Sequence, residues 1–98
     1  MKYRIEYSPE TEDHFRALTT RQQVTVLDTV EKLKYQPAVE TRNRKPMRPN
    51  PIAPWEFRIG NLRVYYDIED DPEHVVYIRA VGIKERNNVR IGKEVIKL

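Results

Sequence analysis

The chain has 98 residues, with 18 Lys or Arg, 15 Asp or Glu and a formal net charge of +3. It contains no Cys, which excludes a disulfide framework, a thiolate metal site and a cysteine nucleophile. No apolar run approaches the roughly 20 residues that a membrane-spanning helix needs. Only two His residues are present, which is few for a metal site. We therefore expect one small domain over residues 1–98, without a metal or other cofactor, and a reducing, cytoplasmic location.

The charges are arranged in blocks along the chain. Residues 42–66 hold six basic residues and one acidic residue, residues 67–75 hold five acidic residues and no Lys or Arg, and residues 76–98 hold six basic and two acidic residues. If the two basic blocks form strands joined by an acidic turn, the basic side chains converge on one surface. Such a surface favours an anionic partner such as nucleic acid, and a solvated surface of mixed charge is the alternative.

The N-terminal residues predict a strand followed by a helix. Residues 2–7 alternate polar and apolar side chains, which is typical of a half-buried strand. The apolar face of this strand carries Tyr3, Ile5 and Tyr7. Ser8 then suits the N-cap of a helix and Pro9 its first position, because a hydroxyl accepts a bond from a free N–H and Pro lacks that donor.

A second helix is predicted to begin at Thr20 and to end before Pro37. Thr20 and Gln23 have the spacing of a capping box. Apolar residues follow at helical spacing: Val24, Val26, Leu27, Val30 and Leu33. The two helices are expected to form an antiparallel hairpin.

The clearest pattern is a β-hairpin over residues 55–68. Two alternating runs flank Gly60-Asn61, which is typical of a two-residue hairpin turn. This turn places Arg58 directly opposite Arg63. One face is then apolar and forms the core: Trp55, Phe57, Ile59, Leu62, Val64 and Tyr66. The other face carries Glu56, Arg58, Arg63, Tyr65 and Asp67.

The remaining segments complete an α+β domain. Residues 42–54 hold four basic residues and four prolines and predict a loop, and residues 69–74 predict an acidic turn. Residues 75–81 predict a strand with three core residues: Val76, Ile78 and Ala80. A short strand is expected near Val89 and Ile91. The order is β-α-α-β-β-β, with the helices on one face of a mostly antiparallel sheet and an open, basic opposite face.

The arginines of this open face are the first candidates for a site. Like charges directly opposite each other destabilise a sheet. Because such departures from local stability tend to occur at functional sites, the pairing of Arg58 with Arg63 indicates a functional role. We expect Arg79 and Tyr65 on the same face, where a guanidinium can bind phosphate and a phenol ring can stack on a base. The alternative is a surface network in which these arginines are neutralised by acids: Glu56, Asp67 and Glu85.

Two further segments add cations that suit phosphate contacts. The segment after the last predicted long strand contributes Lys84, Arg86 and Arg90, and the Pro-rich loop contributes Arg44, Lys45 and Arg48. Solvated, mobile charged loops are the alternative interpretation. His14 and His74 fall outside the basic cluster, which makes both poor candidates for a general base.

The run PWEFRIGNLRVYYDIEDD, followed by VVYIRAVGIKERNNV, resembles the RelE/ParE toxin family of bacterial type II toxin–antitoxin systems. The resemblance implies the fold described above and a small cognate antitoxin as partner. It leaves three activities open. RelE-like members cut mRNA on the ribosome, ParE-like members inhibit DNA gyrase, and some members have lost toxicity. We take a ribosome-dependent mRNA endoribonuclease as the first hypothesis.

The resemblance also implies site residues for a ribonuclease. The catalytic set would be Arg63, Lys84, Arg86 and Arg58. RNA phosphate would be bound by Arg79, Arg90, Tyr65, Arg44, Lys45 and Arg48. Lys84 stands where ribonuclease members carry Arg, and Arg90 stands near the position of a family tyrosine. The reaction would be attack of a 2′-oxygen on the adjacent phosphate without a metal, and Glu85 and Lys84 are the candidate bases.

Overall fold

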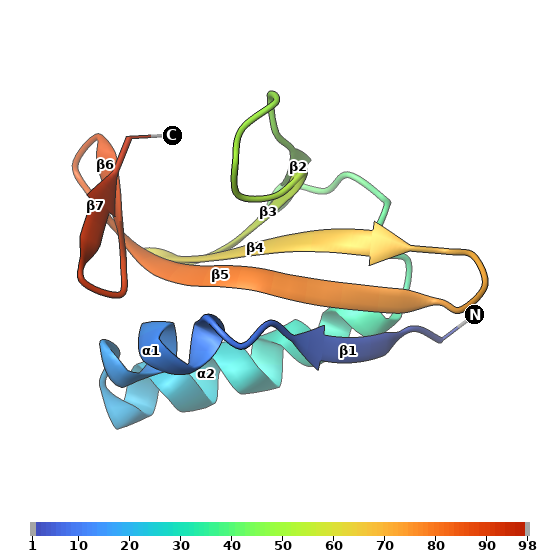
Figure 1. The fold of residues 1–98 in the computed structure, drawn as a ribbon, viewed down its shortest axis with the longest axis horizontal. Helices are drawn as coiled ribbons and strands as arrows, with labels where there is room; N and C mark the ends of the chain where they lie inside the picture. Colours follow the sequence, from blue (N-terminus) through green and yellow to red (C-terminus); the bar gives the residue numbers. More distant parts are fainter. Residues whose placement is uncertain (1, 98) are drawn as a thin grey trace.

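The computed structural model describes residues 2–97 (Figure 1). The elements in chain order are β1 (Arg4–Tyr7), α1 (Thr11–Arg16), α2 (Thr20–Val30), the 3-10 helix η1 (Glu31–Lys34), β2 (Arg44–Pro46), β3 (Trp55–Ile59), β4 (Leu62–Glu69), β5 (Val75–Glu85), β6 (Asn88–Ile91) and β7 (Glu94–Ile96). The helices lie on one face of the sheet, and at one end β6 and β7 curl away from them toward the opposite face. None of the helices in the described part of the chain is long and apolar enough to cross a membrane.

The sheet confirms the expected α+β arrangement. Its strands run in the order β2-β3-β4-β5-β6-β7 and pair antiparallel, and β1 pairs with β5 in parallel. The β3–β4 register also agrees with the sequence, with Arg58 opposite Arg63 and Phe57 opposite Val64. The expectation of a loop throughout residues 42–54 is wrong for Arg44–Pro46, which form the edge strand β2. Pro is tolerated there because an edge strand has unpaired backbone groups.

Both helix starts differ from the expected positions. The N-cap of α1 is Glu10, not Ser8. The Ser8 hydroxyl instead donates to the Arg79 carbonyl over 3.2 Å, and the Ser8 carbonyl accepts from Thr11. The capping box of α2 is formed by Thr19 and Gln22, one residue earlier than expected.

The main core lies between the helices and the sheet. Val26, Val30 and Leu33 are fully buried there against the apolar face of β3 and β4. The expectation that Val24 and Leu27 are buried in this stripe is wrong, because the two residues are 51% and 46% exposed. Fewer apolar residues of α2 are therefore buried against the sheet than the spacing of apolar residues in the sequence predicts.

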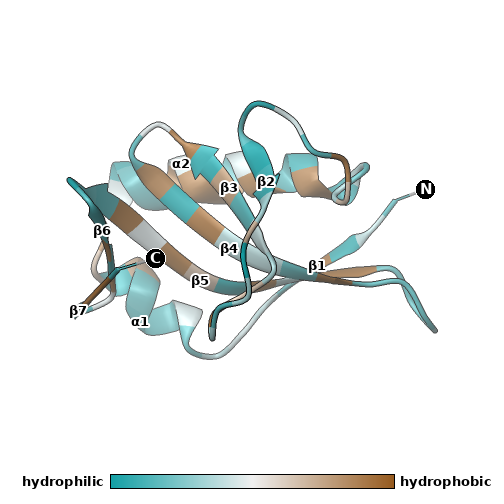
Figure 2. Ribbon diagram, turned by 90° about the horizontal axis from the view of Figure 1, so that it is seen from above, coloured by the Kyte–Doolittle hydropathy of each residue, from teal (hydrophilic) through white to brown (hydrophobic). Residues whose placement is uncertain are grey.

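The opposite face of the sheet carries a second core, which corrects the expectation of an open face. Apolar bands alternate with polar ones along β3 and β4 (Figure 2). The buried residues on this side are Ala53, Tyr65, Ala80, Val89 and Ile91, with Met47, Ile52 and Ile96 packed against them. The loop before β3 and the β6–β7 hairpin supply most of this cover. Asn50 stabilises the loop, because its side chain bonds the backbone of Ala53 in both directions, at 3.0 and 3.1 Å.

A bulge in β5 changes which core its later residues join. Tyr66 is opposite Ile78 and Tyr65 is opposite Ala80, so Arg79 is an extra residue in β5. The extra residue reverses which face each following side chain occupies. The expectation that Ala80 faces the main core is therefore wrong, and Val81 lies in the main core instead.

Candidate nucleic-acid interface

Two tight turns meet at one end of the sheet. The first is the β3–β4 turn at Gly60 and Asn61, and the second is the β5–β6 turn, where Arg86 has a φ of 59°. A backbone bond from the Lys84 N–H to the Asn61 carbonyl, 2.7 Å long, holds the turns together. We call the cations around these turns the basic end: Arg58, Arg63, Lys84 and Arg86.

Arg63 is the most buried cation of the basic end. Its side chain reaches back along the hairpin, where Nη1 donates to the carbonyls of Gly60 and Leu62 over 2.7 and 2.9 Å. The residue is only 9% exposed and makes no ion pair within residues 2–97. Its partners are neutral carbonyls, so no carboxylate compensates its positive charge. An anion that approached this end of the sheet would therefore be attracted to it.

Arg58, directly opposite Arg63, has a different partner. Its Nε donates to Glu56 Oε1 over 2.7 Å. Arg58 is therefore paired with a carboxylate, whereas Arg63 is bonded only to backbone carbonyls. Arg58 keeps 47% of its side chain exposed, so it remains open to an anion.

Lys84 and Arg86 extend the positive surface. Both are exposed, and neither makes an ion pair among residues 2–97. Arg63 pairs with Gly82, and Lys84 is two residues further along β5, so strand alternation places Lys84 on the face of Arg63. The structure therefore places Arg58, Arg63 and Lys84 on one face of the sheet, and Arg86 follows in the adjoining β5–β6 turn.

Tyr65 and Glu56 lie beside the arginines. Glu56 is opposite Tyr65 on one side and Lys45 on the other. Tyr65 is fully buried, which contradicts the expectation of an exposed ring for base stacking. Its hydroxyl has no hydrogen-bond partner within the described residues. Burial and then the Glu56 carboxylate raise the pKa of Tyr65 above its ordinary value, while Arg63 and Arg58 act in the opposite direction.

Two other candidates lie away from the basic end. Arg44 stands opposite the core residue Phe57, with its guanidinium 5.6 Å from the ring centroid, and donates to the Gln36 carbonyl over 2.9 Å. Arg79 lies at the bulge, 3.8 Å from the Asp67 carboxylate and 5.0 Å from the centre of the Tyr77 ring. Both arginines therefore have local structural partners.

Arg90 falls on the wrong face for the expected site. It is opposite Ile83, whose side chain lies in the main core, so Arg90 faces the helix side. Its Nε pairs with Glu85 over 3.2 Å. Glu85 follows Ile83 by two residues in β5, so strand alternation places Glu85 on the helix side and not on the face of Arg63. Lys45 shares the face of Glu56, whereas Arg48 is exposed on the loop before β3.

Glu56 is a residue of this surface that the sequence analysis names only as an acid that neutralises arginines. The hairpin register already placed it opposite Tyr65 and two residues from Arg58, and that signal could have identified it. No group of three or more His, Asp or Glu in residues 2–97 is arranged to hold a metal ion.

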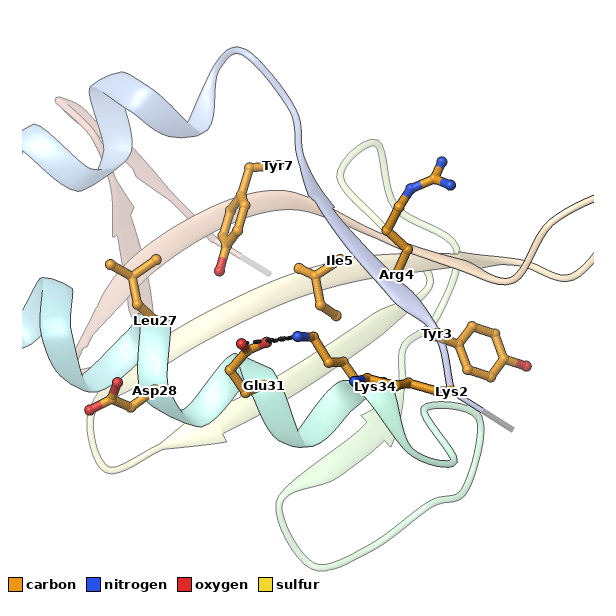
Figure 3. Close-up of a pocket in the computed structure, with 9 residues that line it drawn as sticks. All are labelled: Lys2, Tyr3, Arg4, Ile5, Tyr7, Leu27, Asp28, Glu31 and Lys34. Carbon is orange, nitrogen blue, oxygen red and sulfur yellow. Dashed lines mark hydrogen bonds and ion pairs between the residues drawn. The ribbon is translucent and has the colours of Figure 1, made fainter.

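A groove on the helix side is the other notable surface. It lies between β1 and α2 and has a volume of about 710 Å³. Tyr7 and Leu27 face it from the two sides (Figure 3), and they are 38% and 46% exposed. Glu31 and Lys34 form an ion pair of 2.9 Å along its rim. An exposed apolar groove with charged edges suits a peptide partner.

Helices on one face of a mostly antiparallel sheet and a cluster of cations at the sheet end define a small α+β domain suited to anionic partners. Residues 5–88 match the model of a family described as the ParE toxin of the type II toxin–antitoxin system parDE. The chain therefore belongs to this toxin family. No curated protein matches the sequence.

Solved structures agree in fold. The chain is similar to one in the toxin–antitoxin complex RelBE2 from Mycobacterium tuberculosis, with a TM-score of 0.72 and 22% identity, covering 86% of this chain and 100% of that one. It is also similar to a chain of the archaeal RelE–RelB complex from Pyrococcus horikoshii OT3, with a TM-score of 0.69 and 18% identity, covering 88% of this chain and 99% of that one. These similarities confirm the RelE/ParE-like fold.

Proposed function

We propose that this toxin is a ribosome-dependent endoribonuclease that cuts mRNA in the cytoplasm. The observation that carries the proposal is the environment of Arg63, a nearly buried guanidinium with only carbonyl partners. Lys84 and Arg86 add two charges without ion pairs at the same end of the sheet. A phosphodiester would supply the negative charge that this arrangement lacks.

The chemistry needs no metal ion. The RNA 2′-oxygen attacks the adjacent phosphorus, and negative charge accumulates on the non-bridging phosphate oxygens. Cations placed in advance around that position stabilise the charge more than they stabilise the ground state. Arg58, Arg63, Lys84 and Arg86 serve this role, and the ribosome contributes by holding the mRNA in position.

A cognate antitoxin is the proposed protein partner. Both solved relatives are complexes of a toxin with its antitoxin. The groove between β1 and α2 offers exposed Tyr7 and Leu27 to an apolar peptide segment. Acidic residues of the same partner would neutralise the basic end and block the site.

Inhibition of DNA gyrase is the second candidate function. The matching family model is that of the ParE toxin, which favours this alternative. Binding to gyrase would use the same cations as an adhesive surface and would require no general base.

Inducible expression in bacteria, with primer extension on a defined mRNA, separates these functions. We expect growth arrest and cuts within translated codons, and loss of both in Arg63→Ala. Arg16→Ala is the control, because Arg16 is an exposed arginine of α1 whose partners are Glu12 and Asp13. Circular dichroism confirms that both variants fold. Arrest with intact mRNA and a DNA-damage response would replace the proposal with gyrase inhibition, and absence of arrest with soluble protein would indicate an inactive toxin.

A further inference from the structure

Glu56 is a nearly buried carboxylate beside the basic end. Its side chain is 12% exposed, and Oε1 accepts from Arg58 Nε over 2.7 Å. Lys45 is its neighbour on β2. Within residues 2–97, this is the one carboxylate that forms an ion pair with a member of the basic end. A proton acceptor therefore lies beside the cations of the basic end.

The buried hydroxyl of Tyr65 marks the same place. Tyr65 is opposite Glu56, is fully buried and lacks a hydrogen-bond partner among the described residues. The β3–β4 register places Arg58 opposite Arg63, two pairs further along the same ladder.

Neutralisation of Arg58 does not by itself account for Glu56. An exposed ion pair contributes little to stability, and Arg58 keeps nearly half of its side chain in solvent. A Gln at position 56 would accept the same bond from Arg58 Nε. The carboxylate differs from that amide in being able to take a proton.

We infer that Glu56 is the general base of the proposed ribonuclease, an assignment that rests on the proposed function. Its carboxylate removes the proton of the RNA 2′-hydroxyl as the 2′-oxygen forms a bond to the adjacent phosphorus. The bond from phosphorus to the 5′-oxygen breaks, and that oxygen takes a proton from water. The products are a 2′,3′-cyclic phosphate and a 5′-hydroxyl end, while Arg58 and Arg63 hold the phosphate.

The test is single-turnover cleavage of mRNA on programmed ribosomes by the purified toxin. Glu56→Gln should lower the rate by about 100-fold or more, because an amide cannot take the proton of the 2′-hydroxyl. Cosedimentation with ribosomes should stay within about twofold, because the amide still accepts from Arg58.

Two variants complete the test. Glu56→Asp keeps a carboxylate and should cut at least about tenfold faster than Glu56→Gln. Glu12→Gln, on the exposed surface of α1, should match wild type. If wild type cuts and Glu56→Gln cuts equally fast, or if Glu56→Gln loses ribosome binding, the assignment is overturned and the proposed function stands. If wild type leaves mRNA intact on ribosomes, the proposed function fails and the assignment fails with it.

Discussion

Tyr65 and Tyr66 are consecutive in β4 and both fully buried, yet they lie in different cores. Tyr66 packs with the helices and donates its hydroxyl to the buried Pro37 carbonyl over 2.8 Å. Tyr65 lies under the loop before β3, and its hydroxyl has no partner in the described part of the chain. Successive residues of a strand point to opposite faces of the sheet, so these two neighbouring tyrosines lie in two different environments.

Replacement of each tyrosine by Phe should therefore have opposite consequences. Tyr66→Phe leaves the Pro37 carbonyl unpaired and should lower the free energy of unfolding by about 1–3 kcal/mol. Tyr65→Phe removes an unpaired hydroxyl and should leave that free energy unchanged or raise it by up to about 1 kcal/mol. Urea unfolding measures both, and a larger loss for Tyr65→Phe would show that its hydroxyl has a partner.

The capping box offers a matched pair in Thr19 and Thr20. Thr19→Ala removes the acceptor for the Gln22 N–H and should reduce the free energy of unfolding by about 1 kcal/mol. Thr20→Ala is the control, since Thr20 is exposed and follows the cap, and it should change stability by less than about 0.5 kcal/mol. Equal losses in thermal or urea unfolding would contradict the observed cap position.

Gly82 is required by the close approach of β6 to β5. A Cβ there would lie 2.7 Å from both the Arg90 carbonyl oxygen and Val89 Cγ1. Gly82→Ala should therefore destabilise the protein by about 3 kcal/mol. Gly60→Ala is the control, since Gly60 has open space but a φ of 59°, and it should cost about 1 kcal/mol. The reverse order in chemical unfolding would show that β6 can move away easily.

His14 makes stability depend on pH. Its Nδ1 accepts from the Val81 N–H over 3.3 Å, beside the β5 bulge, which requires the neutral ring. Burial lowers the pKa of His14 below its ordinary value of 6.5, and the carboxylates of Glu10, Asp13 and Glu94 oppose that shift. The unfolded chain then binds more protons just below pH 6.5, so the stability present above that pH is lost as the pH falls through the folded pKa.

The measurement is the free energy of unfolding at about pH 7.5 and pH 5.5, for wild type and for His14→Gln. Gln can accept the Val81 bond but does not titrate. Wild type should lose more stability on acidification than His14→Gln. An equal loss in both proteins would assign the pH dependence to other groups.

Much of the site could be derived from local pattern. A two-residue turn at Gly60-Asn61 sets the register of its hairpin, so Arg58 opposite Arg63 followed from residues close in sequence. The cap of α2 was misplaced by one residue because Thr19 and Thr20 are each followed by Gln at the capping-box spacing. Contacts with the end of α1 explain why Thr19 and not Thr20 is the cap. The Gln23 side chain donates to the carbonyls of Phe15 and Leu18, so it is unavailable for a capping box with Thr20.

The sequence by itself determined the α+β class, the β3–β4 hairpin and the cations at its end, because turns and alternation are local. Only the tertiary structure decided the rest. The bulge at Arg79 depends on how β4 and β5 pair, and the second core joins Ala53, Tyr65 and Ile91 from segments distant in sequence. Such contacts depend on long-range packing, which no local spacing encodes. That packing buried Tyr65 beside Glu56 and turned Arg90 to the opposite face.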